Sequence, residues 1–368
     1  LRADPETDLT VIAITGSAGK TTAKDLIADL PSGQGATVWP PNSYNNEVGV
    51  PLTALRADAS TRFLVLEMGA RSVGNLAYLT SLVRPDIAVE LNVGSAHSGV
   101  FGSAENTARA KAELVESLIP GGLAVLNADD VRVSAMRERL AEGVRIAWFT
   151  KRGTSRPDYA AEDQEVIAAE DVAADASGRA SFILHLPEAE PQQVRLALLG
   201  EHHVGNARAA AAVAHACGVP ARQIATTLAP SGAASSWRME LIDSPSGVTV
   251  INDAYNANPD SMRQALKTLA AMGRGDAESG PRRTYAVLGE MLALGEDPLQ
   301  APADIAEPVV RPHVTRTPVP AARPTPIYPA ARLEAPWGRA ARPAEPAAQP
   351  RHLLHAHDLT PLSPHRPP

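Results

Sequence analysis

Short, almost uninterrupted apolar runs recur along the first 150 residues, and stretches with helical spacing separate them. The runs lie at 9–15 (LTVIAIT), 63–68 (FLVLEM), 87–93 (IAVELNV), 123–126 (LAVL) and 144–149 (VRIAWF). Apolar strands of this kind, alternating with helices, are typical of a parallel sheet that is buried on both faces. The pattern therefore predicts an α/β fold with a mostly parallel sheet.

Helical spacing or helix-boundary residues predict helices at 21–30, 104–118, 206–217 and 259–272. Residues 181–199, and 238–242 with 248–251, are instead predicted as hairpins at the edge of the sheet. A polar linker at 273–283 precedes an apolar run at 284–288. We expect this run to be the first strand of a further α/β domain.

Composition narrows the class of protein. A chain of 368 residues with 44% hydrophobic residues is long enough for two or three domains. Its single cysteine, Cys217, excludes an internal disulfide and favours a cytosolic protein. No apolar run is long enough to span a bilayer, residues 1–10 are too polar for a signal peptide, and a net charge of −7 gives no reason to expect nucleic-acid binding.

The C-terminal part has a different composition. Residues 301–368 hold 16 of the 32 prolines and no lysine, so we expect disordered, extended chain there. It is either a natural tail or the product of a frameshift in a GC-rich gene, and the abrupt end of the α/β pattern favours the frameshift. The expected division is 1–275 for one α/β domain, 276–300 for a linker and the start of a second, and 301–368 for the tail.

The loop after the first apolar run has the composition of a phosphate-binding loop. It lies between a predicted strand and a predicted helix and consists of Gly16, Ser17, Ala18, Gly19, Lys20, Thr21 and Thr22. Backbone N–H groups at the glycines can surround phosphates, Lys20 supplies positive charge, and the Thr21 hydroxyl can ligate Mg²⁺. Ile14 replaces the first glycine of the commonest form of this motif, and the alternative is a glycine-rich turn with a solvated lysine.

Three further residues could serve a metal ion near the phosphates. Glu67 ends one predicted strand and His97 follows the next, at the edge where parallel sheets bind ligands. Lys111 lies on the helix predicted at 104–118. Taken alone, these residues could equally be a solvated acid, a loop histidine and a surface lysine.

Several motifs in order resemble the Mur ligases. They are TGSAGKTT, YNNEVGVP, LEMGA, NVGSAH, ARAKAEL, LNADD and DAYNANPDSM, and the resemblance covers residues 8–297. Together with AVLGEMLALGE at 286–296, the YNANP segment is most similar to members that add D-alanyl-D-alanine to UDP-N-acetylmuramoyl-tripeptide. The resemblance implies a P-loop ATP-binding domain and an ATP- and Mg²⁺-dependent amide ligase that acts through an acyl phosphate. We expect it to be a monomer.

The resemblance also assigns roles to residues. It implies that Lys20 and Thr21 bind phosphate and Mg²⁺, and that Glu67 and His97 are metal ligands. It implies that Lys111 is carbamylated and holds a second Mg²⁺. The candidate catalytic residues are therefore Lys20, Lys111 and His97, and the candidate metal ligands are Thr21, Glu67, His97 and Lys111.

On the nucleoside side, the resemblance implies contacts from Asn206, Arg238, Asp253, Asn256 and Asn258. Their alternatives are a helix cap for Asn206, a surface arginine at a strand end for Arg238, and turn chemistry for the others. Two departures from the family, His203 for asparagine and Leu91 for threonine, put details of the nucleotide contacts in question.

The family has an N-terminal domain for the sugar nucleotide and a C-terminal domain that closes over ATP. From Leu1 and from the end of the pattern near Gln300, we expect this chain to lack the first and to hold only the start of the second, and so to ligate little. Folylpolyglutamate or cyanophycin synthetases remain alternatives for the substrate. A nucleotide-binding fragment without ligase activity is an alternative of another class.

Overall fold

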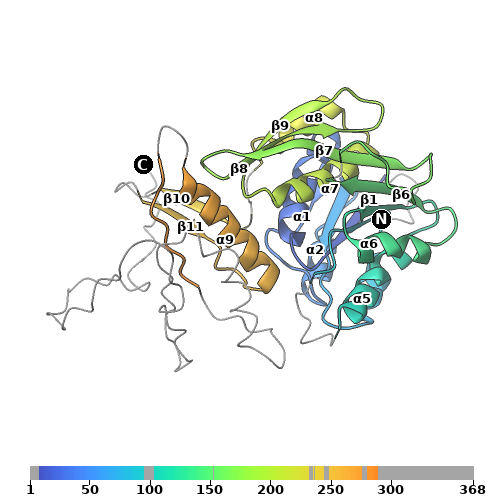
Figure 1. Cartoon of the computed structure of the whole chain (residues 1–368). Helices are drawn as coiled ribbons and strands as arrows, with labels where there is room; N and C mark the ends of the chain where they lie inside the picture. The colour runs from blue at the N-terminus through green and yellow to red at the C-terminus, as the bar shows by residue number, and fades with distance from the viewer. Residues whose placement is uncertain are drawn as a thin grey trace, which may run out of the picture. The chain divides into compact units, whose positions relative to one another are not determined.

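The computed structural model describes residues 8–94, 103–151, 153–231, 235, 237–243, 248–275 and 280–288. Its main feature is a nine-stranded sheet with the strand order β2-β3-β1-β4-β5-β6-β7-β8-β9 (Figure 1). The strands are β1 (Thr10–Thr15), β2 (Ala36–Val38), β3 (Thr61–Glu67), β4 (Ile87–Glu90), β5 (Leu123–Asn127), β6 (Arg145–Thr150), β7 (Glu165–Ala174), β8 (Arg179–His185) and β9 (Gln192–Leu199). Along this order, all neighbouring strands from β2 to β7, including β1, pair in parallel. β8 pairs antiparallel with both β7 and β9. The predicted mostly parallel sheet with a hairpin at its edge is confirmed.

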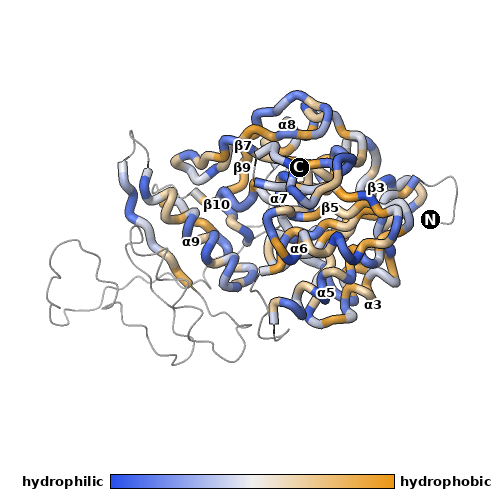
Figure 2. The backbone as a smooth tube through the Cα atoms, turned by 45° about the vertical axis from the view of Figure 1, so that its right-hand side comes forward, coloured by the Kyte–Doolittle hydropathy of each residue, from blue (hydrophilic) through white to orange (hydrophobic). Residues whose placement is uncertain are grey.

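Both faces of the sheet are buried, as the apolar runs predict. In β1, Ile12 and Ile14 belong to one hydrophobic cluster, and Val11 and Ala13 to the other. The first cluster includes residues of α1 (Lys20–Asp29), α7 (His203–Ala216) and α8 (Ala221–Leu228). The second includes residues of α2 (Gly49–Ala54), α3 (Asn75–Leu82), α5 (Ala104–Glu116) and α6 (Val131–Ala135). Two 3₁₀ turns, η1 (Pro31–Gln34) and η2 (Met136–Arg139), complete this part. In Figure 2 the tube near the label β5 is orange, as expected for an apolar strand.

Helix α7 owes its position to its alanines. Its sequence, HVGNARAAAAVAHA, is buried from His203 to Ala214 apart from Gly205, and it packs against α1 and against β5 to β8. Alanine side chains let two helices and a sheet approach closely without overpacking. This close approach brings the first turn of α7 to the start of α1.

The order of the strands creates the place for a ligand. Strand β1 lies between β3 and β4: the chain passes from β1 to β2 and β3 on one side and then crosses to β4 on the other. In open α/β sheets a crevice forms at such a switch point, outside the carboxyl ends of the strands. Here these ends carry the loop after β1, Glu67 of β3 and Glu90 of β4.

A second, two-stranded sheet follows the large one. Strands β10 (Glu240–Asp243) and β11 (Thr249–Asn252) form the predicted hairpin, and α9 (Pro259–Arg274) follows. The place predicted for this hairpin, at the edge of the large sheet, is wrong, because among the described strands these two pair only with each other. Helix α9 begins at a capping box in which Asn258 and Ser261 bond each other's backbone N–H groups. The strand predicted at 284–288 does not form: these described residues make only an isolated bridge at Tyr285, and a strand needs a ladder of pairs with a neighbour.

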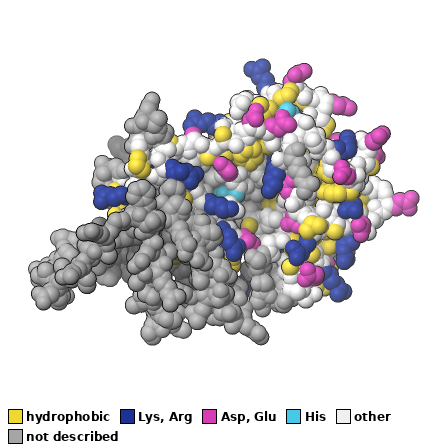
Figure 3. Space-filling view, viewed as in Figure 1, with side chains coloured by type: hydrophobic (Ala, Val, Ile, Leu, Met, Phe, Trp, Pro, Cys, Tyr) yellow, Lys and Arg dark blue, Asp and Glu magenta, His cyan; other side chains and the backbone are white. Residues whose placement is uncertain are grey.

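In the part of the chain that the structure describes, no helix has the length and apolarity needed to cross a membrane. Acidic and basic side chains both lie on the face shown in Figure 3.

Candidate functional site

The loop between β1 and α1 is held in place from the end of β4. The backbone N–H groups of Ser17 and Ala18 donate to the carbonyl oxygen and Oδ1 of Asn92, at 3.0 and 2.9 Å. Asn92 Nδ2 donates in turn to the carbonyl of Ala18 at 3.1 Å, and the N–H of Gly94 donates to Ser17 Oγ at 3.0 Å. The loop is therefore fixed by a strand that lies far from it in the sequence.

Gly19 gives this loop its sharp entry into α1. It adopts the left-handed conformation (φ 83°), and a Cβ placed on it would lie 2.5 Å from Oδ1 of Asn206. No side chain caps the N-terminus of α1 among the described residues. The first N–H groups of α1, including that of the buried Thr22, are thus arranged as in an anion-binding helix terminus.

Lys20 curls back over the loop. Its Nζ donates to the carbonyl of Gly16 at 2.8 Å. Burial lowers the pKa of Lys20 from its ordinary value, while the nearby charges of Glu67 and Glu90 act in the opposite direction and Arg238 adds to the lowering. The ammonium is therefore poised where additional negative charge would stabilise it.

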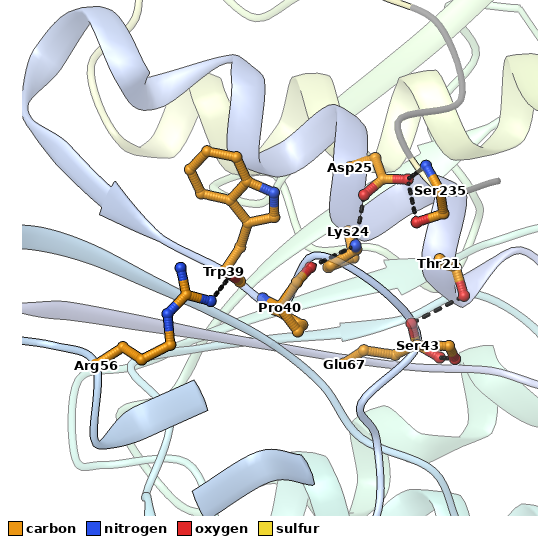
Figure 4. Close-up of polar contacts among 9 residues, drawn as sticks. All are labelled: Thr21, Lys24, Asp25, Trp39, Pro40, Ser43, Arg56, Glu67 and Ser235. Carbon is orange, nitrogen blue, oxygen red and sulfur yellow. Dashed lines mark hydrogen bonds and ion pairs between the residues drawn. The ribbon is translucent and has the colours of Figure 1, made fainter. Parts of the chain in front are cut away.

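Glu67 is the centre of a polar network on the α1 side of the sheet (Figure 4). Thr21 Oγ1 donates to Glu67 Oε2 at 2.9 Å. Ser43 Oγ and Asn45 Nδ2 each donate to Glu67 Oε1 at 2.7 Å. Three hydrogen-bond donors thus fix a carboxylate that is 1% exposed, so its orientation is set in advance.

A second buried group consists of Glu90, Lys111 and their neighbours. Thr15 and Glu90 are paired residues of β1 and β4, and both are fully buried. Neither Thr15 Oγ1 nor either carboxylate oxygen of Glu90 has a hydrogen-bond partner among the described residues. Burial lowers the pKa of Lys111 to about 7, with Lys20 adding to the effect and Glu90 opposing it. Burial raises the pKa of Glu90 well above its usual value.

The residues expected near the nucleoside lie in three places. Asn206 lies in the first turn of α7, and its Nδ2 is 3.2 Å from His203 Nδ1. The helix-cap alternative is wrong, because the N-cap of α7 is His202. The Arg238 guanidinium lies 4.2 Å from the ring centroid of Tyr255, and its Nε is buried without a partner among the described atoms.

The other three belong to the segment between β11 and α9. Asp253 Oδ1 accepts from the N–H of Met239 at 3.1 Å, and burial raises its pKa. Asn258 caps α9, as the local alternative predicts, and Asn256 is exposed. The charge of Arg238 acts on the pKa of Lys20. Among the described residues, the side chain of Asn258 bonds Ser261 and not the phosphate loop.

His97 lies outside the described residues. Within the described part, no three His, Cys, Asp or Glu side chains group closely enough to hold a metal ion by themselves. The paired oxygens of Thr21 and Glu67 nevertheless fit Mg²⁺, which prefers hard oxygen donors and takes its remaining ligands from water and phosphates.

Sequence reasoning missed the residues that orient this site. Glu90 lies inside an apolar run and was therefore interpreted only as part of a strand. A charged residue in such a run is itself a sign of a functional site, because unpaired charges are rarely buried. Ser43, Asn45 and Asn92 act on residues 22 to 75 positions away, and no local pattern indicates such contacts.

Two known family patterns match the sequence of this chain. The sequence pattern of the Mur ligase middle domain matches residues 14–214, and that of the Mur ligase glutamate ligase domain matches residues 237–351. The second match begins before the boundary expected at 275 and extends past residue 301, so the domain boundaries and the origin of the tail stay predictions.

The chain is 43% identical over 316 residues to the UDP-N-acetylmuramoyl-tripeptide–D-alanyl-D-alanine ligase of Mycobacterium leprae, covering 84% of this chain and 60% of that protein. It therefore spans about 60% of the length of the curated relative.

Two solved structures are similar. MurF from Acinetobacter baumannii is 30% identical with a TM-score of 0.74, over 85% of this chain and 64% of that one. MurF ligase from Thermotoga maritima, in complex with ADP, is 25% identical with a TM-score of 0.70, over 86% and 68%. With the middle-domain match extending over more than half of its residues, this chain belongs to the Mur ligase family.

Proposed function

We propose that the protein is an ATP-dependent amide ligase that joins D-alanyl-D-alanine to UDP-N-acetylmuramoyl-tripeptide. The observation that carries the proposal is the convergence of Lys20, Thr21 and Glu67 at the carboxyl edge of a parallel sheet, beside an uncapped helix N-terminus. The relatedness to D-alanyl-D-alanine ligases supplies the substrates.

In the proposed reaction, a carboxylate oxygen of the tripeptide attacks the γ-phosphorus of ATP. An oxygen–phosphorus bond forms, the bond to the β-phosphate oxygen breaks, and ADP leaves. The amine of D-alanyl-D-alanine then attacks the acyl carbon, phosphate leaves, and the amine loses a proton. Such reactions depend mainly on positioning and on stabilising negative charge.

The phosphate loop supplies this stabilisation. The N–H groups at the start of α1 would bind the phosphates, and Lys20 would move from the Gly16 carbonyl to the β- and γ-phosphates. Thr21 and Glu67 would hold Mg²⁺, and His97 is proposed as a further ligand. The bound cation would offset the negative charge that develops during phosphoryl transfer.

Lys111 and Glu90 form the second part of the proposal. A lysine with a pKa of about 7 is partly neutral at physiological pH, so its Nζ can add to carbon dioxide, with a proton lost to solvent. The resulting carbamate would be an oxygen ligand for a second Mg²⁺. Before this reaction, Glu90 is the neighbouring acidic group that opposes the lowering of the pKa of Lys111.

On the nucleoside side, we propose that Asn206, Arg238, Asp253, Asn256 and Asn258 line the adenosine site. Support is direct for Asn206, whose amide touches Gly19 of the loop, and for Arg238, whose charge acts on Lys20. Asp253 joins them through Met239, the residue next to Arg238.

The test is to incubate the 368-residue chain with ATP, Mg²⁺, UDP-N-acetylmuramoyl-tripeptide and D-alanyl-D-alanine, and to measure the amide product by mass spectrometry. We expect a small amount of product, as the sequence predicts for this chain, that depends on all four components and that K20M abolishes. The matched control is K267M, which removes an exposed lysine from α9.

A panel of amine and acid substrates separates the alternatives. A product formed with folate and glutamate, or with an aspartate–arginine polymer, but not with the muramoyl peptide, would show that the protein acts on the substrates of another branch of the superfamily. Binding of ATP with no amide product from any pair would favour a nucleotide-binding role alone.

A further inference from the structure

An ion pair is buried inside α1, one turn after the phosphate loop. Lys24 Nζ lies 2.5 Å from Asp25 Oδ1, and the two side chains are 0% and 2% exposed. Burial raises the pKa of Asp25, and the Lys24 charge and Ser235 oppose this rise. Among the described residues, the polar partners of the two side chains lie outside the phosphate loop, so the mechanism above gives the pair no task.

Lys24 holds the start of the connection between β2 and α2, residues 39–48. Its Nζ donates to the carbonyl of Pro40 at 2.9 Å, and Arg56 Nη1 donates to the preceding carbonyl, that of Trp39, at 2.9 Å (Figure 4). A few residues further on, the same connection presents Ser43 and Asn45 to Glu67. The buried ammonium therefore fixes the base of the segment that orients the Glu67 carboxylate.

Asp25 holds a different segment, the one that leads from α8 towards β10. The N–H and Oγ of Ser235 both donate to Asp25 Oδ2, at 3.3 and 3.0 Å. In the same segment Ser231 Oγ donates to Asp29 Oδ2 at 3.1 Å, one turn further along α1. The ion pair thus joins, at one point of α1, the Glu67-bearing network and the path to β10 and Arg238.

Stability alone does not account for such a pair. Removing two charges from water costs about as much as their attraction returns, and replacing a buried pair by apolar side chains is often neutral or stabilising. The two charges instead orient the groups that are hydrogen-bonded to them. An apolar side chain would leave these groups without a partner.

We propose that Lys24 and Asp25 are positioning residues for the divalent cation: Lys24 holds residues 40–45 so that Glu67 stays aimed at Thr21, and Asp25 holds Lys24 and links this arrangement to Ser235. The inference rests on the proposed function in one respect, the role of Glu67 as a cation ligand.

The experiment measures Mn²⁺ binding to the full chain in the presence of ADP, by electron paramagnetic resonance of free Mn²⁺, and separately ADP binding without metal, by calorimetry. The principal variant is K24M/D25L, which replaces both charges with apolar side chains of similar size. We expect it to bind Mn²⁺ about tenfold more weakly, as is usual when groups that orient a metal ligand are lost, and to bind metal-free ADP within about twofold of the wild type.

The two serines provide a second, milder test with a matched control. S235A removes a donor to Asp25, and S231A removes the equivalent donor to Asp29 on the same helix. We expect Mn²⁺ binding about threefold weaker for S235A, the effect of one modest hydrogen bond, and unchanged for S231A. If circular dichroism shows that K24M/D25L does not fold, this pair decides.

Mn²⁺ affinity of a folded K24M/D25L within twofold of the wild type, or equal values for S235A and S231A, would overturn the proposal. Failure of the wild type to bind ADP would overturn the proposed function instead. An equal loss of Mn²⁺ and metal-free ADP binding in K24M/D25L would show a general structural effect and also overturn the positioning role.

Discussion

Gly19 carries two separate constraints at the scale of the single residue. Its left-handed conformation turns the chain from the loop into α1, and its missing side chain leaves room for the Asn206 amide. A short side chain at this position would both strain the backbone and displace the Asn206 amide. The residue therefore connects the shape of the loop to the packing of two helices.

We predict that G19A destabilises the protein more than G121A does. Both glycines have positive φ, 83° and 76°, so each alanine costs about 1–2 kcal/mol of backbone strain. A Cβ at 121 meets nothing within 4 Å, whereas one at 19 meets Asn206. We expect a further loss of about 1–3 kcal/mol for G19A, as for other overpacked sites, measured by urea unfolding. Equal free energies of unfolding for the two variants would contradict the close approach of Asn206.

Because Lys111 is buried, we predict that the free energy of unfolding depends on pH. The pKa of this lysine falls from 10.5 in the unfolded chain to about 7 in the folded protein. Between these values the unfolded state binds more protons, so the free energy of unfolding rises with pH. From pH 7 to pH 9 the gain from this residue is about 2 kcal/mol.

The measurement compares urea unfolding of the wild type and K111M at both pH values, in buffer freed of carbon dioxide so that the amine stays unmodified. We expect the rise in the wild type to exceed that in K111M. The same pH slope in both proteins would show that Lys111 is not desolvated.

At the scale of elements, α7 shows how composition sets packing distance. The helix fits between α1 and the sheet because its inner residues are alanines, and the fit brings Asn206 to the loop. From the sequence, the alanine-rich helix was predicted, but its partners were not, because an alanine run has no apolar stripe that indicates which face is covered.

We predict that A211L costs about 1–3 kcal/mol in the free energy of unfolding, because Ala211 is fully buried and a leucine would force the helices apart. The matched control is A135L, the same substitution at an exposed position of α6. Equal stability of the two variants by urea unfolding would show that α7 has room to spare.

The strands that could be predicted are those with long apolar runs. β1, β3, β4, β5 and β6 are such strands, whereas β2 has three residues and lies at the edge, too short to show a pattern. In the site, Lys20, Thr21 and Glu67 were predicted because they follow strand ends. Their hydrogen-bond partners were not, because Ser43 and Asn92 reach the site only through the tertiary fold.

At the scale of the whole molecule, nucleotide binding should be visible as stability. A ligand at one hundred times its Kd stabilises the folded state by about 2.7 kcal/mol, which is about 3–5 °C in Tm for a protein of this size. We predict a rise of this order with Mg²⁺ and ADP in scanning fluorimetry, and a much smaller rise for K20M. An unchanged Tm in the wild type at saturating ADP would contradict the assignment of the loop.

The place of β1 in the sheet has a consequence for how the protein is made. β1 precedes both of its neighbours in the chain, and the second of them, β4, begins only at Ile87. At a synthesis rate of about 5–20 residues per second, β1 leaves the ribosome several seconds before that neighbour does. The loop after β1 waits as well, because Asn92 holds Ser17 and Ala18. During translation the nascent chain therefore exposes an apolar strand without its neighbour and a loop without its hydrogen-bond partners. In that interval we expect it to be most prone to aggregation and to chaperone binding.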